Sequence, residues 1–415
     1  MTPLFHIINL GCKVNRVEAD SIAAKLIAAG AEQGDPAEAH VVLINTCTVT
    51  GEADAKSRKA LHRALRQAPH AHVIVCGCGA SANAEQFKED SERYQVIANK
   101  DAALSEAVQL LGLEMPHAGV VVPRFGEDFN TRVAIKIQDG CDHDCSYCIV
   151  PTARGPAQSL DAESVVDEVT AHVKAGAREI VLTGIDLGSY QDKSQRLQHL
   201  LSSLLNDKTS RDTYRIRLSS IELPSISDEL IELIAASEGR ICAHLHIPLQ
   251  SGSDALLKAM RRRYDTDAYL EKLYQIKQAL PHAAISTDII VGFPGESEED
   301  FSDTLSLCKE VGYSRMHIFR YSVRPHTPAA SMPGHLAPEI IAKRAGELRD
   351  LASQLTLQDA ERRIGTREQV LCESAEGGRS ESYYPVRIAG SATRGNLVTM
   401  EILGYEQGRL TAREC

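Results

Sequence analysis

The densest group of chemically reactive side chains in this sequence is a set of three cysteines. Cys141, Cys145 and Cys148 have the spacing C-x3-C-x2-C, and Tyr147 precedes the last of them. In a large chain without an export signal, clustered thiols indicate metal ligands rather than disulfides. Three thiolates can bind three irons of a [4Fe–4S] cluster, whose usual complement is four cysteines, and leave the fourth iron open. The alternative is zinc with His143 as a further ligand, but closed zinc sites usually pair two C-x2-C halves.

A second set of three cysteines is dispersed over the N-terminal region. Cys12, Cys47 and Cys78 each follow a short apolar run that is typical of a strand. Taken alone, each would more often be a small buried residue. Because the carboxyl ends of parallel strands meet at one edge of a sheet, we expect the three thiols to form a second site there. Cys76 competes as a ligand, but it continues its strand and is expected to pack in the core. No partner at a useful spacing exists for the remaining cysteines, Cys242, Cys308, Cys372 and Cys415.

Strands and helices alternate over the first 112 residues. The apolar runs predict strands at 4–10, 41–45 and 73–76, with helices at 18–29, 53–67, 82–88 and 102–111. Continuous Val and Ile runs between helices indicate a parallel sheet covered on both faces. We therefore expect an N-terminal α/β domain of flavodoxin-like or related type over residues 2–113. Prolines and glycines at 114–130 predict a linker.

A second alternating series follows the linker. Strands are predicted at 132–138, 179–182, 215–219, 243–247, 285–291 and 316–320, with helices between them, such as 162–175 and 300–311. Six such units are too few for a closed eight-stranded barrel, so we expect a partial (β/α) barrel over residues 127–356. The Cys141 loop directly follows its first strand.

The C-terminal region changes character. An extended proline-containing connection at 324–338 leads to a predicted helix at 339–363. Short strands at 368–372, 384–388, 397–402 and 409–412, separated by glycine-rich turns, then predict a small all-β barrel over residues 359–415.

The charge balance limits how this chain could bind nucleic acid. It has 45 basic and 56 acidic residues, a net charge of −11 and no Trp. This argues against binding by overall positive charge or by an aromatic platform, but it does not exclude RNA bound through a local patch. Lys56, Lys59, Arg63 and Arg66 form one stripe of a predicted helix and could contact phosphates. The commoner alternative for such a stripe is a solvated surface face, and the same holds for the run 261–263.

No feature of the sequence predicts a membrane protein. No apolar run approaches the roughly 20 residues that a spanning helix needs. The N-terminus lacks a basic segment followed by an apolar one, so it does not resemble a signal peptide. A cytoplasmic protein without membrane association is expected.

The C-x3-C-x2-C motif, with its aromatic residue, resembles the radical S-adenosylmethionine superfamily. The resemblance implies that the open iron binds the amino and carboxylate groups of S-adenosylmethionine, whose cleavage yields a deoxyadenosyl radical. Tyr147 and four residues in loops after predicted strands are the expected cofactor contacts: Gly184, Gln250, Gly292 and Gly295. In barrels such loops lie at the active face. No further catalytic residue is predicted.

A closer resemblance, to the methylthiotransferases, rests on residues 10–15 (Leu-Gly-Cys-Lys-Val-Asn), 45–50 (Asn-Thr-Cys-Thr-Val-Thr) and 77–78 (Gly-Cys). Those enzymes join a three-cysteine domain to a radical core and a C-terminal TRAM barrel. The resemblance implies two [4Fe–4S] clusters, one held by Cys12, Cys47 and Cys78, together with S-adenosylmethionine. It also implies a tRNA substrate, a reductant such as flavodoxin or ferredoxin, and a monomer.

Residues 11–15, 47–50 and 53–58 are similar to the branch that acts on threonylcarbamoyladenosine next to the anticodon, adding a methylthio group at C2. Residues 156–159 (Pro-Ala-Gln-Ser) depart from this pattern, since many relatives carry an arginine before the serine. Three alternatives stay open: the same chemistry on isopentenyladenosine in tRNA, the same chemistry on a ribosomal-protein side chain, or a non-catalytic iron–sulfur or zinc RNA-binding protein.

Overall fold

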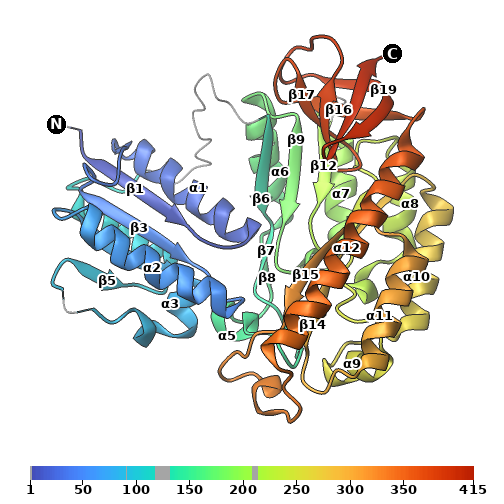
Figure 1. Cartoon of the computed structure of the whole chain (residues 1–415). Coiled ribbons are helices and arrows are strands. Elements are labelled where there is room, and N and C mark those ends of the chain that lie inside the picture. Colours follow the sequence, from blue (N-terminus) through green and yellow to red (C-terminus); the bar gives the residue numbers. More distant parts are fainter. Residues whose placement is uncertain (1, 90, 117–130, 208–213) are drawn as a thin grey trace. The chain divides into compact units, whose positions relative to one another are not determined.

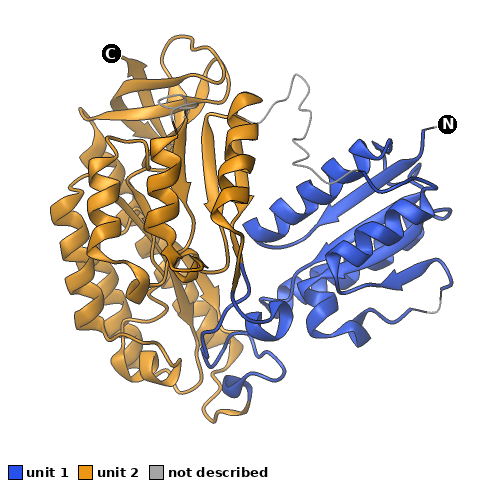
Figure 2. Ribbon diagram, turned by 180° about the vertical axis from the view of Figure 1, so that it is seen from behind, with its two compact units in different colours: residues 1–126, 139–157, 322–330 blue, residues 127–138, 158–321, 331–415 orange. Residues whose placement is uncertain are grey.

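The computed structural model describes residues 2–89, 91–116, 131–207 and 214–415. Residue contacts divide the chain into two compact units (Figure 2). Unit 1 contains residues 1–126, 139–157 and 322–330, and unit 2 contains residues 127–138, 158–321 and 331–415. The Cys141 loop therefore groups with the N-terminal sheet. Nearly all of the predicted linker at 114–130 lies outside the described residues.

A five-stranded parallel sheet forms the centre of unit 1 (Figure 1). Its strands are β1 (Leu4–Asn9), β2 (Glu32–Gln33), β3 (Val41–Thr46), β4 (His72–Gly77) and β5 (Tyr94–Val96). Their order is β2-β1-β3-β4-β5, and every neighbouring pair is parallel. This is the flavodoxin-like order, which confirms the predicted fold type. All six residues of β3 are buried, as expected for a strand covered on both faces.

Helices cover both faces of this sheet. They are α1 (Lys13–Ala28), α2 (Gly51–Gln67), α3 (Cys78–Ala82), the 3-10 turn η1 (Ala84–Phe87) and α4 (Lys100–Leu110). The short helix α5 (Val150–Arg154) packs against α3. One buried cluster contains apolar residues of α1 and α4, and the other contains those of α2. The prediction of a helix beginning at residue 18 was wrong, because Cys12 already adopts the extended N-cap conformation. The predicted helix at 82–88 is interrupted at Asn83, whose φ of −158° is not helical.

Six parallel strands form the core of unit 2. They are β6 (Arg132–Lys136), β9 (Glu179–Thr183), β12 (Arg215–Leu218), β13 (His244–His246), β14 (Ala284–Val291) and β15 (Arg315–Arg320). The three-stranded sheets β6-β9-β12 and β13-β14-β15 are joined by parallel bridges between Ile216 and Ile241 and between Ser220 and His246. This arrangement confirms the predicted partial (β/α) barrel.

The remaining elements of the core surround these strands. The helices are α6 (Ala162–Lys174), α7 (Leu197–Asn206), α8 (Asp228–Ala236), α9 (Asp254–Ala259), α10 (Thr266–Ala279), α11 (Glu298–Val311) and α12 (Pro338–Arg363). The short elements of unit 2 are β8 (Gln158–Ser159), β10 (Gln191–Asp192), β11 (Gln195–Arg196), η2 (Leu187–Ser189) and η3 (Leu223–Ser225). β7 (Gln138–Asp139) lies where the chain passes from unit 2 to unit 1, and all but the last residue of η4 (Pro328–Ser331) belong to unit 1. One continuous apolar cluster joins the helices to the strands. Within the described residues, no helix is long and apolar enough to cross a membrane.

The chain ends in a closed barrel of five strands, as predicted. They are β16 (Arg367–Cys372), β17 (Gly377–Ser380), β18 (Pro385–Ile388), β19 (Leu397–Glu406) and β20 (Arg409–Glu414), in the closed order β16-β17-β18-β20-β19. The sequence did not predict β17, because paired glycines are typical of a turn. A Cβ on Gly378 would lie 2.3 Å from the Leu371 carbonyl oxygen, so the pairing of β17 with β16 requires glycine here.

A buried ion cluster, here called the arginine seam, joins the barrel to the core strands of unit 2. It consists of Glu179, Arg215 and Arg217, each at most 1% exposed. The Glu179 carboxylate accepts hydrogen bonds from Arg215 Nε at 2.8 Å and from Arg217 Nε at 2.9 Å. Both guanidinium groups also donate at 2.7–3.0 Å to barrel carbonyls, those of Gln369, Arg379, Ser380 and Glu381. Burial alone would raise the pKa of Glu179, but Arg217 and Arg215 hold it well below its usual range.

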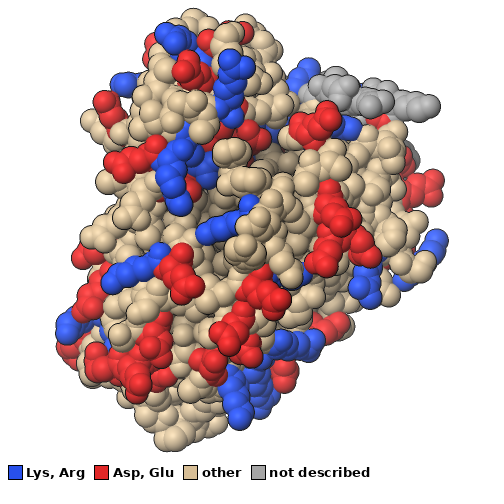
Figure 3. Space-filling view, turned by 90° about the vertical axis from the view of Figure 1, so that its right-hand side faces the viewer, with Lys and Arg blue, Asp and Glu red and all other residues tan. Residues whose placement is uncertain are grey.

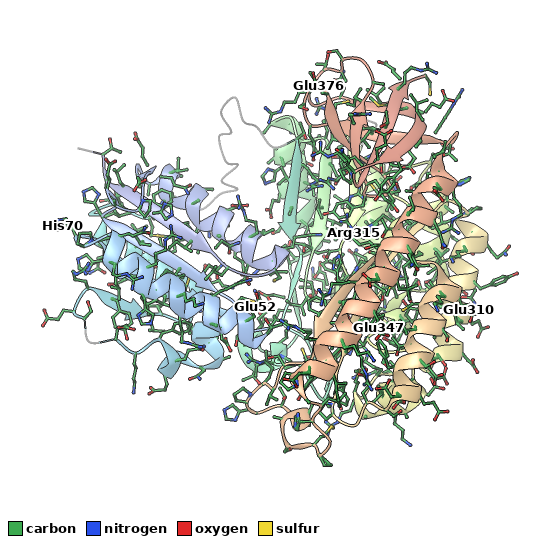
Figure 4. The ribbon with its side chains drawn as sticks, viewed as in Figure 1. Glu52, His70, Glu310, Arg315, Glu347 and Glu376 are labelled. Carbon is green, nitrogen blue, oxygen red and sulfur yellow. The ribbon has the colours of Figure 1, made fainter. Side chains whose placement is uncertain are left out.

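Tyr383 of the barrel reinforces the seam. Its ring centroid lies 4.7 Å from the guanidinium carbon of Arg217 and 5.9 Å from that of Arg315, which Figure 4 labels. The ring also lies 5.0 Å from that of His244. Cation–π contacts of this kind are stabilising when the charge is partly desolvated.

Candidate metal centres

Cys12, Cys47 and Cys78, the first cysteine site, meet at the carboxyl edge of the unit 1 sheet. The three residues follow β1, β3 and β4, respectively. Asn15 Oδ1 lies 3.8 Å from Cys12 Sγ and 3.6 Å from Cys78 Sγ. A Cβ on Gly11 would lie only 3.1 Å from Cys47 Sγ, which brings the third thiol close to the Cys12 loop. The parallel topology thus brings the three cysteines to the same edge of the sheet, and their role as iron ligands stays a prediction.

Asn15 holds this site together, although sequence reasoning treated it only as part of a motif. Its side chain is completely buried. Its Nδ2 donates to the carbonyl oxygens of Leu10 at 3.0 Å and Thr46 at 2.9 Å, so it ties the Cys12 loop to the Cys47 loop. The sequence could have indicated this role by the position of Asn15, about one helical turn after Cys12 at the start of α1.

Burial keeps the inner thiols of the first site protonated when no metal is bound. It raises the pKa of Cys47 to about 11, with smaller upward effects from Cys12 and Cys78. Burial also raises the pKa of Cys78, against the opposing charges of Arg154 and Lys100. Because thiolates are the metal ligands, occupation of the site would release protons.

The other cysteines lie apart from the two candidate sites. Cys76 is completely buried in the apolar cluster that contains Phe5 and Val41, and burial raises its pKa to about 12. Cys308 and Cys372 are buried in the apolar clusters of unit 2, and Cys242 is buried beside the arginine seam. Cys415 is exposed.

Cys141, Cys145 and Cys148, the second cysteine site, occupy the loop between β7 and α5. All three are partly exposed. The Cys148 amide donates to the Cys145 carbonyl at 3.1 Å, and the His143 amide lies 3.4 Å from Cys141 Sγ. These backbone contacts shape the loop around its thiols.

The number of thiols at each site matches a [4Fe–4S] cluster that keeps one iron open, because such a cluster takes one thiolate at each of several irons. Among the residues that the structure describes, no three His, Cys, Asp or Glu side chains are placed to hold a single metal ion. Each site offers three thiols, which leaves one iron of such a cluster available for another ligand.

Gly140 makes the second site possible, and its replacement by alanine is expected to destroy that site. Its φ is +68°, and a Cβ there would lie 1.9 Å from the Pro156 carbonyl oxygen. Gly140→Ala should therefore lose the iron of the second site while the first site retains its own, measured as iron per chain after anaerobic reconstitution. Gly346→Ala is the control, because Gly346 lies within α12 of unit 2, has no positive φ and has open space where its Cβ would be. Full iron in Gly140→Ala would contradict this account.

The segment 322–330 of unit 1 contacts both cysteine loops. The Ala329 amide donates to the Ser146 carbonyl at 2.8 Å, beside Cys145. Arg324 donates to the Thr48 carbonyl at 3.1 Å and forms an ion pair with Asp54. These contacts fix the backbone on either side of the thiols.

The predicted cofactor contacts of unit 2 lie in turns beyond the carboxyl ends of their strands. A Cβ on Gly184 would lie 2.8 Å from Gln138 Oε1. Gln250, Gly292 and Gly295 have positive φ values of +72°, +80° and +85°. The Gly292 amide is already bonded to Glu296 Oε2, at 2.8 Å. These constraints explain the three glycines without a ligand, so the binding role of Gly184, Gln250, Gly292 and Gly295, and that of Tyr147 in unit 1, stays a prediction.

All four basic residues of the predicted stripe are exposed on α2: Lys56, Lys59, Arg63 and Arg66. Lys56 pairs with Glu52 at 2.8 Å, and Figure 4 labels Glu52 at the start of this helix. Phosphate binding by the stripe stays a prediction. In the second basic run, Arg262 is instead only 4% exposed and pairs with Glu222.

A cavity of about 800 Å³ in unit 2 contains none of the predicted site residues. It lies between the ends of α10, α11 and α12 and the start of β16, and its lining mixes basic Lys277 and Arg362 with acidic Asp359 and Glu368. Acidic and basic side chains also intermingle on the face shown in Figure 3. Because the cavity has a lining of mixed charge and contains no predicted site residue, its size alone does not mark it as the reaction site.

Two family models match the chain. Residues 4–99 match the uncharacterized protein family UPF0004, and residues 135–308 match the radical SAM superfamily. Each match contains one of the two cysteine sites.

Relatives of similar length carry names that describe tRNA modification. The chain is 39% identical over 376 residues to the threonylcarbamoyladenosine tRNA methylthiotransferase MtaB of Bacillus subtilis, covering 86% of this chain and 82% of the relative. The protein of the same name from Rickettsia prowazekii is 33% identical over 415 residues, covering 97% and 96%. A tRNA-2-methylthio-N(6)-dimethylallyladenosine synthase from Endomicrobium trichonymphae is 33% identical over 382 residues, covering 90% of each chain.

Solved structures resemble the fold. The radical S-adenosylmethionine methyltransferase TsrM from Kitasatospora setae, solved with tryptophan and a cofactor analogue, matches with a TM-score of 0.59. The match covers 91% of this chain and 80% of that one at 15% sequence identity. At this identity the likeness concerns the fold alone.

Proposed function

Because the chain belongs to the radical S-adenosylmethionine methylthiotransferase family, we propose that it adds a methylthio group to C2 of threonylcarbamoyladenosine next to the anticodon of tRNA. The observation that carries this proposal is the pair of three-thiol sites within unit 1. A chemistry that both generates a radical and inserts sulfur needs two such sites.

The residues of each site have distinct tasks in this proposal. Cys141, Cys145 and Cys148 would bind three irons of a [4Fe–4S] cluster, which when bound supplies the electron that cleaves S-adenosylmethionine. Cys12, Cys47 and Cys78 would hold a second cluster and with it the sulfur to be transferred. Asn15 fixes the geometry of the first site, and the Ala329–Ser146 bond fixes the loop of the second.

Two features of the sequence support the substrate branch. Residues 11–15 (Gly-Cys-Lys-Val-Asn) resemble the threonylcarbamoyladenosine branch, and relatives with 33–39% identity carry that name. Exposed basic residues of α2 would contact tRNA phosphates. A flavodoxin or ferredoxin would supply electrons to a monomeric enzyme in the cytoplasm.

A substrate comparison tests the proposal. The protein is reconstituted anaerobically and given reductant, sulfide, S-adenosylmethionine and tRNA carrying either threonylcarbamoyl- or isopentenyladenosine, and digested nucleosides are read by mass spectrometry. We expect one methylthio group on the threonylcarbamoyl nucleoside only.

The other outcomes are equally informative. Modification of the isopentenyl nucleoside alone would support the chemistry but overturn the assigned substrate branch. The Endomicrobium trichonymphae relative carries a name of that other branch. Deoxyadenosine without either product would place the substrate elsewhere, such as on a protein. Neither deoxyadenosine nor product, with two clusters verified, would contradict the enzymatic assignment.

A further inference from the structure

We propose that Arg154 is a positioning residue that ties the second cysteine site to the first and sets the reduction potential of the cluster at Cys12, Cys47 and Cys78. This inference rests on the proposed function, because it requires a cluster at the first site. It assigns a role to a side chain that binds no iron itself.

The local fold brings Arg154 to both sites. Arg154 ends α5, the short helix that begins two residues after Cys148. Cys78 begins α3, and α3 packs against α5 within unit 1. A side chain at the end of α5 can therefore reach the thiols of the first site.

The contacts of Arg154 show where its charge lies. Its side chain is only 4% exposed. One guanidinium nitrogen donates to Asn15 Oδ1 at 2.5 Å, the same oxygen that lies 3.6 Å from Cys78 Sγ. The other donates to Glu18 Oε1 at 3.0 Å and to Asp139 Oδ1 at 2.7 Å. Asp139 lies two residues before Cys141 in the sequence. One buried cation thus contacts Asn15 at the first site and the strand that leads into the second.

A buried cation beside a cluster favours its reduced form. Reduction adds one negative charge, and a nearby positive charge interacts strongly with it where water is excluded. Glu18 opposes this effect, since its carboxylate lies against Arg154 and also pairs with Lys100. Outer residues that hydrogen-bond around a metal centre commonly tune it in this way.

The inference predicts potential shifts of opposite sign. The test uses the full chain with Cys141, Cys145 and Cys148 all replaced by alanine, so that any cluster resides at the first site. Its midpoint potential is measured by titration followed with electron paramagnetic resonance. Arg154→Gln should lower the midpoint potential, and Glu18→Gln should raise it. Arg154→Lys keeps the positive charge, so its midpoint potential should stay close to that of the parent. General loosening of the site would not shift the potential in opposite directions.

Asp20→Asn is the matched control, because Asp20 lies on the same helix with its side chain 54% exposed and paired with Arg16. It should leave the potential unchanged. Equal potentials in Arg154→Gln and the parent, or a lowered one in Glu18→Gln, would overturn the inference. If Arg154→Gln does not retain iron, the inference is tested by the direction in which Glu18→Gln shifts the midpoint potential. No cluster in the parent itself would instead contradict the proposed function.

Discussion

Removing one thiol of the second cysteine site is expected to abolish deoxyadenosine formation, whereas removing one thiol of the first is expected to leave that formation intact and abolish sulfur insertion. The two sites use separate sets of cysteines, held by different loops of unit 1. Cys145→Ala would remove one of the three iron ligands that leave an iron open to S-adenosylmethionine. Cys47→Ala would remove a ligand only from the site that is proposed to hold the sulfur.

The measurement pairs two assays on the same anaerobic reaction. Deoxyadenosine is quantified by chromatography, and methylthiolated nucleoside by mass spectrometry, with iron content measured for every variant. Cys415→Ser and Cys308→Ala are the controls, since one thiol is exposed at the C-terminus and the other lies in the core of unit 2. Deoxyadenosine at the parental rate in Cys145→Ala, with its iron content verified, would contradict the assignment of the second site.

Replacing Glu179 with glutamine is expected to destabilise unit 2 more than any surface substitution. The carboxylate is completely buried between Arg215 and Arg217, so its loss leaves two buried guanidinium groups without their counter-charge. Breaking a buried pair in this way typically costs about 3–5 kcal/mol. Urea unfolding of the metal-free protein would measure the effect. Glu310→Gln is the control, because Glu310, labelled in Figure 4, lies exposed on α11.

The same carboxylate predicts how stability depends on pH. Arg217 and Arg215 hold the pKa of Glu179 well below its ordinary range, although burial by itself would raise it. A carboxyl group whose pKa is lowered by folding stabilises the protein fully above its unfolded pKa, roughly 4.3, and less as the pH falls below it. The difference in stability between the parent and Glu179→Gln should therefore be constant near neutral pH and shrink below about pH 4. A difference that grows as the pH falls would contradict this explanation.

Much of the first cysteine site could be predicted because it depends only on topology. Cys12, Cys47 and Cys78 follow predicted parallel strands, and the carboxyl ends of such strands meet whatever the details of packing. The second cysteine site was simpler to predict, because Cys141, Cys145 and Cys148 lie within a few residues of one another in the sequence. In both cases local patterns carried the information.

The residues that connect these sites could not be predicted in the same way. Arg154 is 139 residues from Asn15 in the sequence, and no periodic pattern relates the two. Arg215 and Arg217 alternate with apolar residues on β12, which is typical of a strand with one face in water. They are buried because the C-terminal barrel covers that face, and the barrel carbonyls that they bond lie more than 150 residues away in the sequence.

The arginine seam holds the barrel at a fixed position on the core strands of unit 2. Glu179 and Arg215 are the first residues of β9 and β12, so the barrel is bonded to the amino ends of the core strands, while the turn at Gly184 follows the opposite end of β9. Five strand residues span roughly 17 Å. Because Arg215 and Arg217 are buried and bonded to barrel carbonyls, the barrel cannot turn away from these strands without exposing both charges. The barrel therefore moves with the core strands of unit 2 as one body, and its surface keeps the same distance from their carboxyl ends.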